Sequence, residues 1–67
     1  MNVTINGKKQ QLSSSIITIQ GLVEWLELEP TGVAVAVNLE VISKINWLST
    51  PLKDGDVIDI IQARQGG

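Results

Sequence analysis

The most constraining feature of the chain is a strand-like stretch, residues 33–38, in which valines alternate with alanines. Successive side chains of a β-strand point to opposite faces of the sheet, so the three valines share one face and Ala34 and Ala36 share the other. If the valines pack on a core, the opposite face carries only small side chains. Such a face either admits the surface of another protein or simply lines an exposed sheet, and the sequence leaves both interpretations open.

A β-hairpin is predicted at the start of the chain. Residues 2–6 alternate between polar and apolar side chains, which is typical of a half-buried strand. Asn6-Gly7 tolerates positive φ at both central positions of a type I′ turn, so residues 8–12 are expected to return as an antiparallel strand. Leu12 is the inward-facing residue of that second strand.

A helix is predicted to follow the hairpin. Thr18 is its natural N-cap, because a threonine hydroxyl can accept a hydrogen bond from a free backbone amide of the first turn. Four apolar residues at helical spacing form one stripe over about three turns: Ile19, Leu22, Val23 and Leu26. Gly21 weakens this prediction: it costs about 1 kcal/mol relative to alanine in a helix interior, which is tolerable if the backbone approaches the sheet closely. Pro30 ends the helix, since the residue before a proline avoids the helical region.

The segment after the alternating strand is predicted to turn back and close the core. Residues 38–40 form a tight turn and residues 41–44 a short strand. Residues 45–48 are apolar without a strand period, and we expect Trp47 and Leu48 to cover the open end of the core. The other tryptophan, Trp25, is expected to pack at the rim of the helix rather than to stack on a ligand.

An acidic turn precedes the last predicted strand. Gly55 can take positive φ, and Asp54 and Asp56 can accept hydrogen bonds from nearby backbone amides. We expect no calcium loop here, because the other ligand positions and the terminal bidentate glutamate of that motif are missing. Residues 57–62 then form a strand with two sets of side chains: Ile58 and Ile60 on one face, and Val57, Asp59 and Ile61 on the other. Ile61 is expected on the outer face beside Ala36.

The predicted elements follow the order strand, strand, helix, strand, short strand, strand. A hairpin followed by a crossover helix and further strands is typical of an α+β fold with the helix on one face of the sheet. The crossover allows the first strand to pair in parallel with the last, which gives a β-grasp arrangement: a mixed sheet of four to five strands with one main helix packed on one face. We expect residues 1–62 to form this domain and residues 63–67 to be a flexible tail.

Length and composition exclude several other classes of protein. The chain has 67 residues, enough for one domain, and no cysteine or histidine for disulfides or the usual zinc sites, so its packing must be well ordered. Five Lys and Arg against seven Asp and Glu argue against a nucleic-acid partner. No apolar run approaches the roughly 20 residues that cross a bilayer, and the first residues do not resemble a signal peptide. We therefore expect no membrane partner and a cytoplasmic location, with which the lack of cysteine is compatible.

The sequence closes on Gly66 and Gly67, two residues without a Cβ atom. A segment of this kind is thin and flexible and can enter a narrow channel. Chain ends are also commonly disordered and tolerant of glycine, so a frayed terminus is the alternative. With glycine at about 7% of positions, two terminal glycines arise by chance in about 0.5% of chains.

Four segments together resemble the thiamine-biosynthesis sulfur carrier family, ThiS. They are residues 35–38, Val-Ala-Val-Asn; Trp47; residues 52–60, Leu-Lys-Asp-Gly-Asp-Val-Ile-Asp-Ile; and Gly66-Gly67. The Asp-Gly-Asp block is common to ubiquitin-like folds, whereas its combination with the other segments is more specific. The resemblance spans essentially the whole chain and implies a ubiquitin-like β-grasp fold. Residues 42–44 are Ile-Ser-Lys where family members often carry Val-Pro-Arg, so the cation is kept without arginine's planar fork.

The resemblance implies a chemistry centred on Gly67. Its carboxylate would be adenylated by an E1-like activating enzyme of the ThiF type, which uses ATP with Mg²⁺, and a sulfur donor protein would then displace AMP to leave a thiocarboxylate. A thiazole synthase of the ThiG type would receive the sulfur. The chain has no Cys, His or Tyr and no Walker or Gly-x-Gly-x-x-Gly motif, so we expect it to be no enzyme and to bind no cofactor or metal itself.

Six residues form the candidate site on this interpretation. Gly67 is the reactive residue, Gly66 gives steric access to it, and the partner-binding surface is expected to include Ala34, Ala36, Lys44 and Ile61 as well as the two glycines. Three alternatives stay open: the small subunit of molybdopterin synthase, a ubiquitin-like modifier conjugated to lysines, and a β-grasp interaction module whose tail is inert. The short chain and its lack of Phe and Tyr favour the thiamine pathway over molybdopterin.

Overall fold

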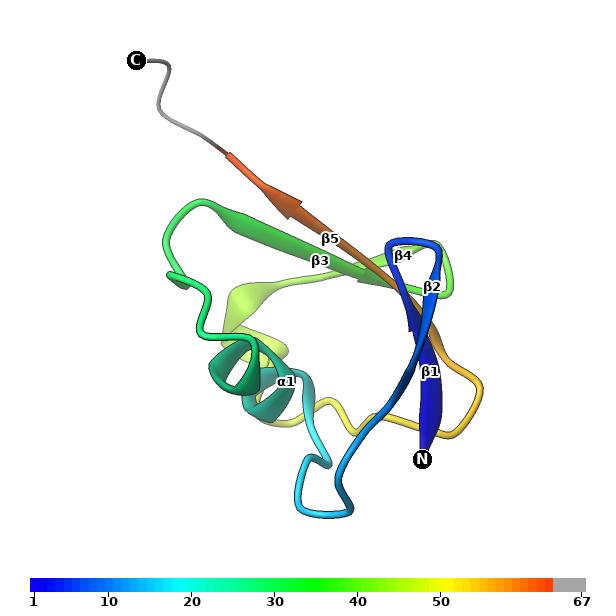
Figure 1. Cartoon of the computed structure of the whole chain (residues 1–67). Helices are drawn as coiled ribbons and strands as arrows, with labels where there is room; N and C mark the ends of the chain where they lie inside the picture. The colour runs from blue at the N-terminus through cyan, green and yellow to red at the C-terminus, as the bar shows by residue number, and fades with distance from the viewer. Residues whose placement is uncertain (64–67) are drawn as a thin grey trace.

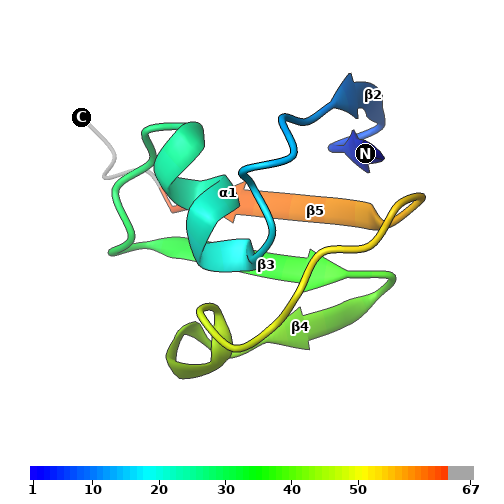
Figure 2. The same cartoon turned by 90° about the horizontal axis from the view of Figure 1, so that it is seen from below.

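The strands pair into one sheet that is covered on one face by the helix (Figures 1 and 2). The computed structural model describes residues 1–63. Within them the strand order is β2-β1-β5-β3-β4. The elements are β1 (Asn2–Ile5), β2 (Lys8–Gln11), α1 (Ile19–Trp25), β3 (Val33–Val37), β4 (Glu40–Ile42), the short 3-10 helix η1 (Lys44–Asn46) and β5 (Val57–Gln62).

The last strand occupies the centre of this sheet. β5 pairs in parallel with β1, where Ile5 lies opposite Ile58, and antiparallel with β3, where Val35 lies opposite Ile60. The predicted parallel pairing of the first and last strands is therefore confirmed. The mixed five-stranded sheet with α1 on one face is the predicted β-grasp arrangement.

The first hairpin closes through the predicted type of turn. Asn6 and Gly7 both have positive φ, 51° and 83°. β2 is one residue shorter than predicted, because Leu12 lies just beyond it. Leu12 is nevertheless buried, and its backbone amide donates to the carbonyl oxygen of Met1 at 2.8 Å. The first residue of the chain is thus tied to the end of the hairpin.

The helix begins where the sequence predicts but ends earlier. The Thr18 hydroxyl accepts a hydrogen bond from the amide of Gly21 at 3.1 Å, which confirms the N-cap. α1 has seven residues rather than about three turns, and Leu26 is its C-cap. Glu27 takes a left-handed conformation, φ 57°, and stops the helix before Pro30 has any influence. Within residues 1–63, no helix has the length and apolar character needed to cross a membrane.

The hydrophobic core lies between α1 and the inner face of the sheet. Its buried members are Val3, Ile5, Leu12, Ile16, Ile19, Leu22, Val23, Val35, Trp47, Leu52 and Ile58. Trp47 is 1% exposed and donates its indole N–H to the carbonyl oxygen of Ile42 at 3.0 Å, so its predicted place over the core is confirmed. The same prediction is wrong for Leu48, which is 73% exposed. Trp47 ends η1 and turns inward, and the next side chain points to solvent. Trp25 is 46% exposed, as expected at a rim.

The acidic turn before β5 is held by its two aspartates. Asp54 accepts a hydrogen bond from the amide of Asn2 at 2.7 Å. Asp56 is buried and accepts from the amide of Lys53 at 2.8 Å and from the side-chain amide of Asn38 at 3.0 Å. The predicted use of both carboxylates as acceptors for backbone amides is therefore confirmed. These bonds connect the β3–β4 turn to the start of β5.

Replacement of Asp56 by alanine is predicted to lower the free energy of unfolding by about 2–3 kcal/mol. The substitution removes a buried carboxylate that accepts hydrogen bonds from both the Lys53 amide and the Asn38 side chain. Asp54→Ala is the matched control, since the bond from Asn2 is exposed and water can replace the carboxylate. Urea unfolding should show a loss of less than about 1 kcal/mol for that control. Equal losses for the two variants would contradict the assignment.

Gly21 does not have the role that the sequence suggested. A Cβ atom built there meets only Thr18 Oγ1 at 3.5 Å and Ile16 Cγ2 at 4.0 Å, which are ordinary contacts, and neither atom belongs to the sheet. The expectation of a close approach to the sheet is wrong. Gly21→Ala is therefore predicted to stabilise the chain by roughly 0.5–1 kcal/mol, because alanine loses less backbone entropy in a helix. A lowered midpoint of thermal unfolding would contradict this prediction.

Candidate functional site

The strand register assembles a second set of side chains on the face of the sheet opposite α1. Ala36 of β3 lies between Val41 of β4 and Asp59 of β5, and Ala34 lies opposite Ile61. Because side chains alternate along a strand, these five residues project away from the core. We call the surface made by Ala34, Ala36, Val41, Asp59 and Ile61 the outer face. The direct neighbour of Ile61 is Ala34, whereas the sequence placed it beside Ala36.

Apart from Asp59, the outer face is apolar and open. Ile61 is 66% exposed and Val41 73% exposed, whereas Ile60 and Ile42, which precede and follow them on the inner face, are partly buried against the core. Figure 2 shows α1 on the other side of β3 and β5. The small side chains of Ala34 and Ala36 leave the backbone of β3 accessible to a flat partner surface. Isolated exposed apolar residues are ordinary, but a contiguous set on one sheet face is typical of an interaction surface.

The structure brings three of the predicted site residues together and separates a fourth. Ala34, Ala36 and Ile61 share the outer face. Lys44 is exposed and lies in η1, beyond the end of β4, so strand pairing does not place it beside them. Gly66 and Gly67 lie outside the described residues. The last described residue, Ala63, donates its amide to the carbonyl oxygen of Gly32 at 2.7 Å.

Val41 is a member of the outer face that sequence reasoning missed. A predicted turn at residues 38–40 leaves the register of the following strand undefined. The observed turn has two central residues, Asn38 and Leu39, and the register follows from it: Val37 lies opposite Glu40, and Ala36 opposite Val41. Asn38 was the available signal for a two-residue turn, because asparagine tolerates positive φ. The leucine that follows it is not typical of such turns, so the turn was not recognised.

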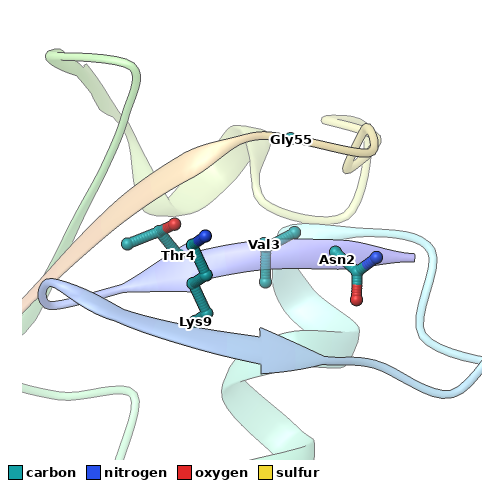
Figure 3. A pocket seen from close by; sticks show the side chains of 5 residues that line it. All are labelled: Asn2, Val3, Thr4, Lys9 and Gly55. Atoms are coloured by element: carbon teal, nitrogen blue, oxygen red, sulfur yellow. The ribbon is translucent and has the colours of Figure 1, made fainter.

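A shallow pocket of about 250 Å³ lies beyond the outer face, where β1 and β2 meet the acidic turn (Figure 3). It is lined by Asn2, Val3, Thr4, Lys9 and Gly55. Thr4 and Lys9 lie opposite each other on neighbouring strands and offer one hydroxyl and one amine. Across residues 1–63, no three or more His, Cys, Asp or Glu side chains gather as metal ligands would. The outer face therefore remains a stronger candidate for the functional site than this pocket.

Comparison with known proteins gives the family. The model of the ThiS family matches residues 3–67. The chain belongs to the ThiS family. The sulfur carrier protein ThiS of Thermus thermophilus is 34% identical over 65 residues, which are 97% of this chain and 98% of that protein. The crystal structure of the thiamine biosynthesis protein ThiS from Geobacter metallireducens superposes with a TM-score of 0.83 at 29% identity and covers 100% of both chains.

A further relative is a much longer protein. The thiazole synthase of Paramagnetospirillum magneticum is 33% identical over 67 residues, which are 100% of this chain but only 20% of that protein. The ThiS-like part is thus a fifth of a larger chain in that case. The likeness to ThiS proteins extends over nearly their full length, and it identifies this chain as a sulfur carrier of thiamine biosynthesis with the ubiquitin-like β-grasp fold.

The outer face is predicted to be dispensable for folding. Ile61→Thr keeps a β-branched side chain at a position that is 66% exposed, so we expect the free energy of unfolding to change by less than about 0.5 kcal/mol. Ile58→Thr is the same substitution in the same strand at a position that is 0% exposed. It removes buried apolar atoms and buries a hydroxyl, which should cost about 2–4 kcal/mol. Urea unfolding of the pair tests this difference; a comparable loss at Ile61 would mean that the outer face contributes to the core.

Proposed function

We propose that the chain carries sulfur as a thiocarboxylate on Gly67. The observation that carries the proposal is the family match, which continues to residue 67 and so includes the Gly66-Gly67 pair. The match to the Geobacter ThiS structure likewise covers 100% of both chains. A glycine pair without side chains is suited to entering the narrow active sites of other enzymes.

The proposed chemistry needs activation from outside the chain, because a carboxylate is a poor electrophile. A carboxylate oxygen of Gly67 attacks the α-phosphorus of ATP in an E1-like adenylating enzyme of the ThiF type, and pyrophosphate leaves with Mg²⁺. The terminal sulfur of a persulfide on the sulfur donor protein then attacks the glycyl carbon of the acyl-adenylate and displaces AMP, which leaves an acyl disulfide between the two proteins. A second thiol of the enzymes then attacks the donor's own sulfur and breaks this S–S bond, so that the thiocarboxylate is released and the donor is left in a disulfide with that thiol. The carbon keeps one oxygen and gains one sulfur. ATP and magnesium belong to the enzyme, and this chain is proposed to bind no cofactor.

The chain's own part in this scheme is to supply the acyl group. It contains no Cys, His or Tyr to act as nucleophile or base, so it is proposed to be a substrate of these enzymes rather than an enzyme. The absence of cysteine also suits a reducing cytoplasm, which is the proposed location.

The outer face is proposed as the surface on which the partners dock. Ala34 and Ala36 permit close approach, Ile61 supplies apolar area, and Lys44, which lies beyond the end of β4, is proposed to offer a cation to the same partners. A thiazole synthase of the ThiG type is the proposed sulfur acceptor. The relative from Paramagnetospirillum magneticum supports this partner, since a thiazole synthase there contains a segment that aligns with this whole chain.

Reconstitution tests the proposed function. The chain is incubated with the adenylating enzyme, Mg-ATP and a sulfur donor, and its intact mass is measured. Replacement of one oxygen by sulfur at Gly67 supports the sulfur carrier, and subsequent transfer to thiazole synthase rather than to a molybdopterin synthase large subunit supports the thiamine pathway. An isopeptide adduct on a lysine would instead indicate a ubiquitin-like modifier. An unchanged mass would indicate an interaction module with an inert tail.

Deletion of Gly67 is predicted to abolish loading without changing the fold. The described hydrogen-bonded body ends at Ala63, so the midpoint of urea unfolding should stay the same. The terminal carboxylate of the shortened chain would lie one residue short of the position at which the adenylating enzyme acts. We therefore expect mass spectrometry to detect no thiocarboxylate. Gly67→Ala serves as the control for chain length, since it keeps the carboxylate in place and should retain some loading. Full loading of the deletion variant would show that Gly67 is not the reactive residue.

A further inference from the structure

The turn between β3 and β4 carries a leucine where the backbone favours glycine or asparagine. Asn38 and Leu39 have φ angles of 52° and 72°. The left-handed conformation brings Cβ close to a carbonyl oxygen, which asparagine and glycine tolerate and leucine disfavours. Leu39 is also 90% exposed, so its side chain gains almost nothing from packing within the described residues. Neither local conformation nor the core explains a leucine at this position.

Leu39 adjoins the outer face at one end of the sheet. Val41, two residues later, is 73% exposed and lies opposite Ala36. On the other side of the turn, the amide of Asn38 donates to the carbonyl oxygen of Val57 at 2.7 Å, and Val57 is 43% exposed. The exposed leucine therefore extends the apolar surface of the outer face beyond the ends of its strands.

A charge in the middle of the outer face indicates what can cover it. Asp59 is half-buried and lies opposite Ala36. A partner that covers this face removes water from the carboxylate, which is unfavourable unless the partner offers a cation. A second copy of the chain, packed face to face about a two-fold axis, would bring two Asp59 carboxylates towards each other. The charge therefore favours a different protein with a basic side chain beside an aliphatic pocket.

We propose that Leu39 is a specificity anchor for the adenylating enzyme: Leu39 enters an aliphatic pocket of the enzyme while a lysine or arginine of the enzyme pairs with Asp59. This inference rests on the function proposed above. Gly66 and Gly67 have no side chains that distinguish one Gly-Gly tail from another, so the enzyme must select its substrate on the folded body. Leu39 lies near Val57, at the opposite end of β5 from Ala63 (Figure 1), so an enzyme that contacts it recognises the whole length of the sheet.

Two matched leucine variants test the anchor. Leu39→Asn removes the apolar side chain and keeps a residue that tolerates positive φ, so the midpoint of urea unfolding should be unchanged or raised. Its Kd for the adenylating enzyme, measured by isothermal titration calorimetry, should rise by about tenfold. Leu48→Asn makes the same change at a leucine that is 73% exposed but lies outside the outer face, and it should leave the Kd unchanged. Weaker binding together with equal or greater stability is a combination that a purely structural role cannot produce.

Asp59→Asn tests the chemistry of the partner. The substitution should raise the Kd for the adenylating enzyme and make that Kd depend less on salt concentration, because an ion pair that salt screens is lost.

Three results would overturn the proposal. The first is a wild-type Kd for Leu39→Asn, and the second is an equal loss of affinity for Leu48→Asn. The third is a Kd of Asp59→Asn that responds to salt like that of the wild type. A Leu39→Asn chain that binds the adenylating enzyme normally but thiazole synthase weakly would also overturn it. Tight binding of a wild-type chain that never gains sulfur would refute the proposed function, while the comparison of the two leucine variants would still decide the anchor.

Discussion

The fold depends on the last strand reaching the centre of the sheet. β5 lies between β3 and β1, the second of which is separated from it by most of the chain, and Ile58 within β5 is 0% exposed. Two asparagines in the hairpin turns align it. The Asn6 side chain accepts from the amide of Ile60 at 2.7 Å and donates to its carbonyl oxygen at 3.2 Å, so it continues the pairing of β1 with β5 beyond Ile5. The Asn38 side chain accepts from the amide of Val57 at 3.0 Å. Each asparagine therefore adopts a turn conformation and also positions the central strand.

This central position explains how one strand can serve both the core and a partner surface. The inner residues of β5 pack beneath α1, and the intervening residues, among them Asp59 and Ile61, lie on the outer face. β5 is held in the sheet by its backbone hydrogen bonds and by the two asparagine side chains. Its side chains on the outer face are therefore not needed to keep it in place. The proposed function benefits from such a division, because a chain without Cys, His or Tyr leaves the chemistry to its partner enzymes, which then select it by its surface.

Local patterns made most of the fold predictable from the sequence. Alternation identified β1, β3 and β5, the Asn-Gly turn identified β2, and helical spacing identified α1, whereas the short strand predicted at residues 41–44 is wrong in its bounds, because β4 covers Glu40–Ile42. The Thr18 cap and the buried Trp47 follow from chemistry within a few residues. The errors concern interactions that no local pattern encodes. The helix ends at a left-handed Glu27, and Leu48 turns outward after a 3-10 turn.

The same limit applies to the candidate site. Periodicity placed Ala34, Ala36 and Ile61 on one face of the sheet. Val41 could be placed there only from the register of the β3–β4 hairpin, and the leucine at position 39 gave no sign of its two-residue turn. The position of Lys44 outside the sheet likewise depends on where β4 stops.

The β3–β4 turn shows why a residue that contradicts the local rules carries information. Asn38 obeys them, since its positive φ is tolerated and its side chain holds both Val57 and Asp56. Leu39 breaks them in two ways at once, by backbone conformation and by exposure. The side chain of Asn38 holds the turn through its bonds to Val57 and Asp56, whereas the side chain of Leu39 is 90% exposed and contributes almost no packing. Glycine and asparagine can hold this left-handed conformation with little strain, and packing within the described residues does not offset the strain of a leucine there. The proposed contact with the adenylating enzyme accounts for leucine at this position.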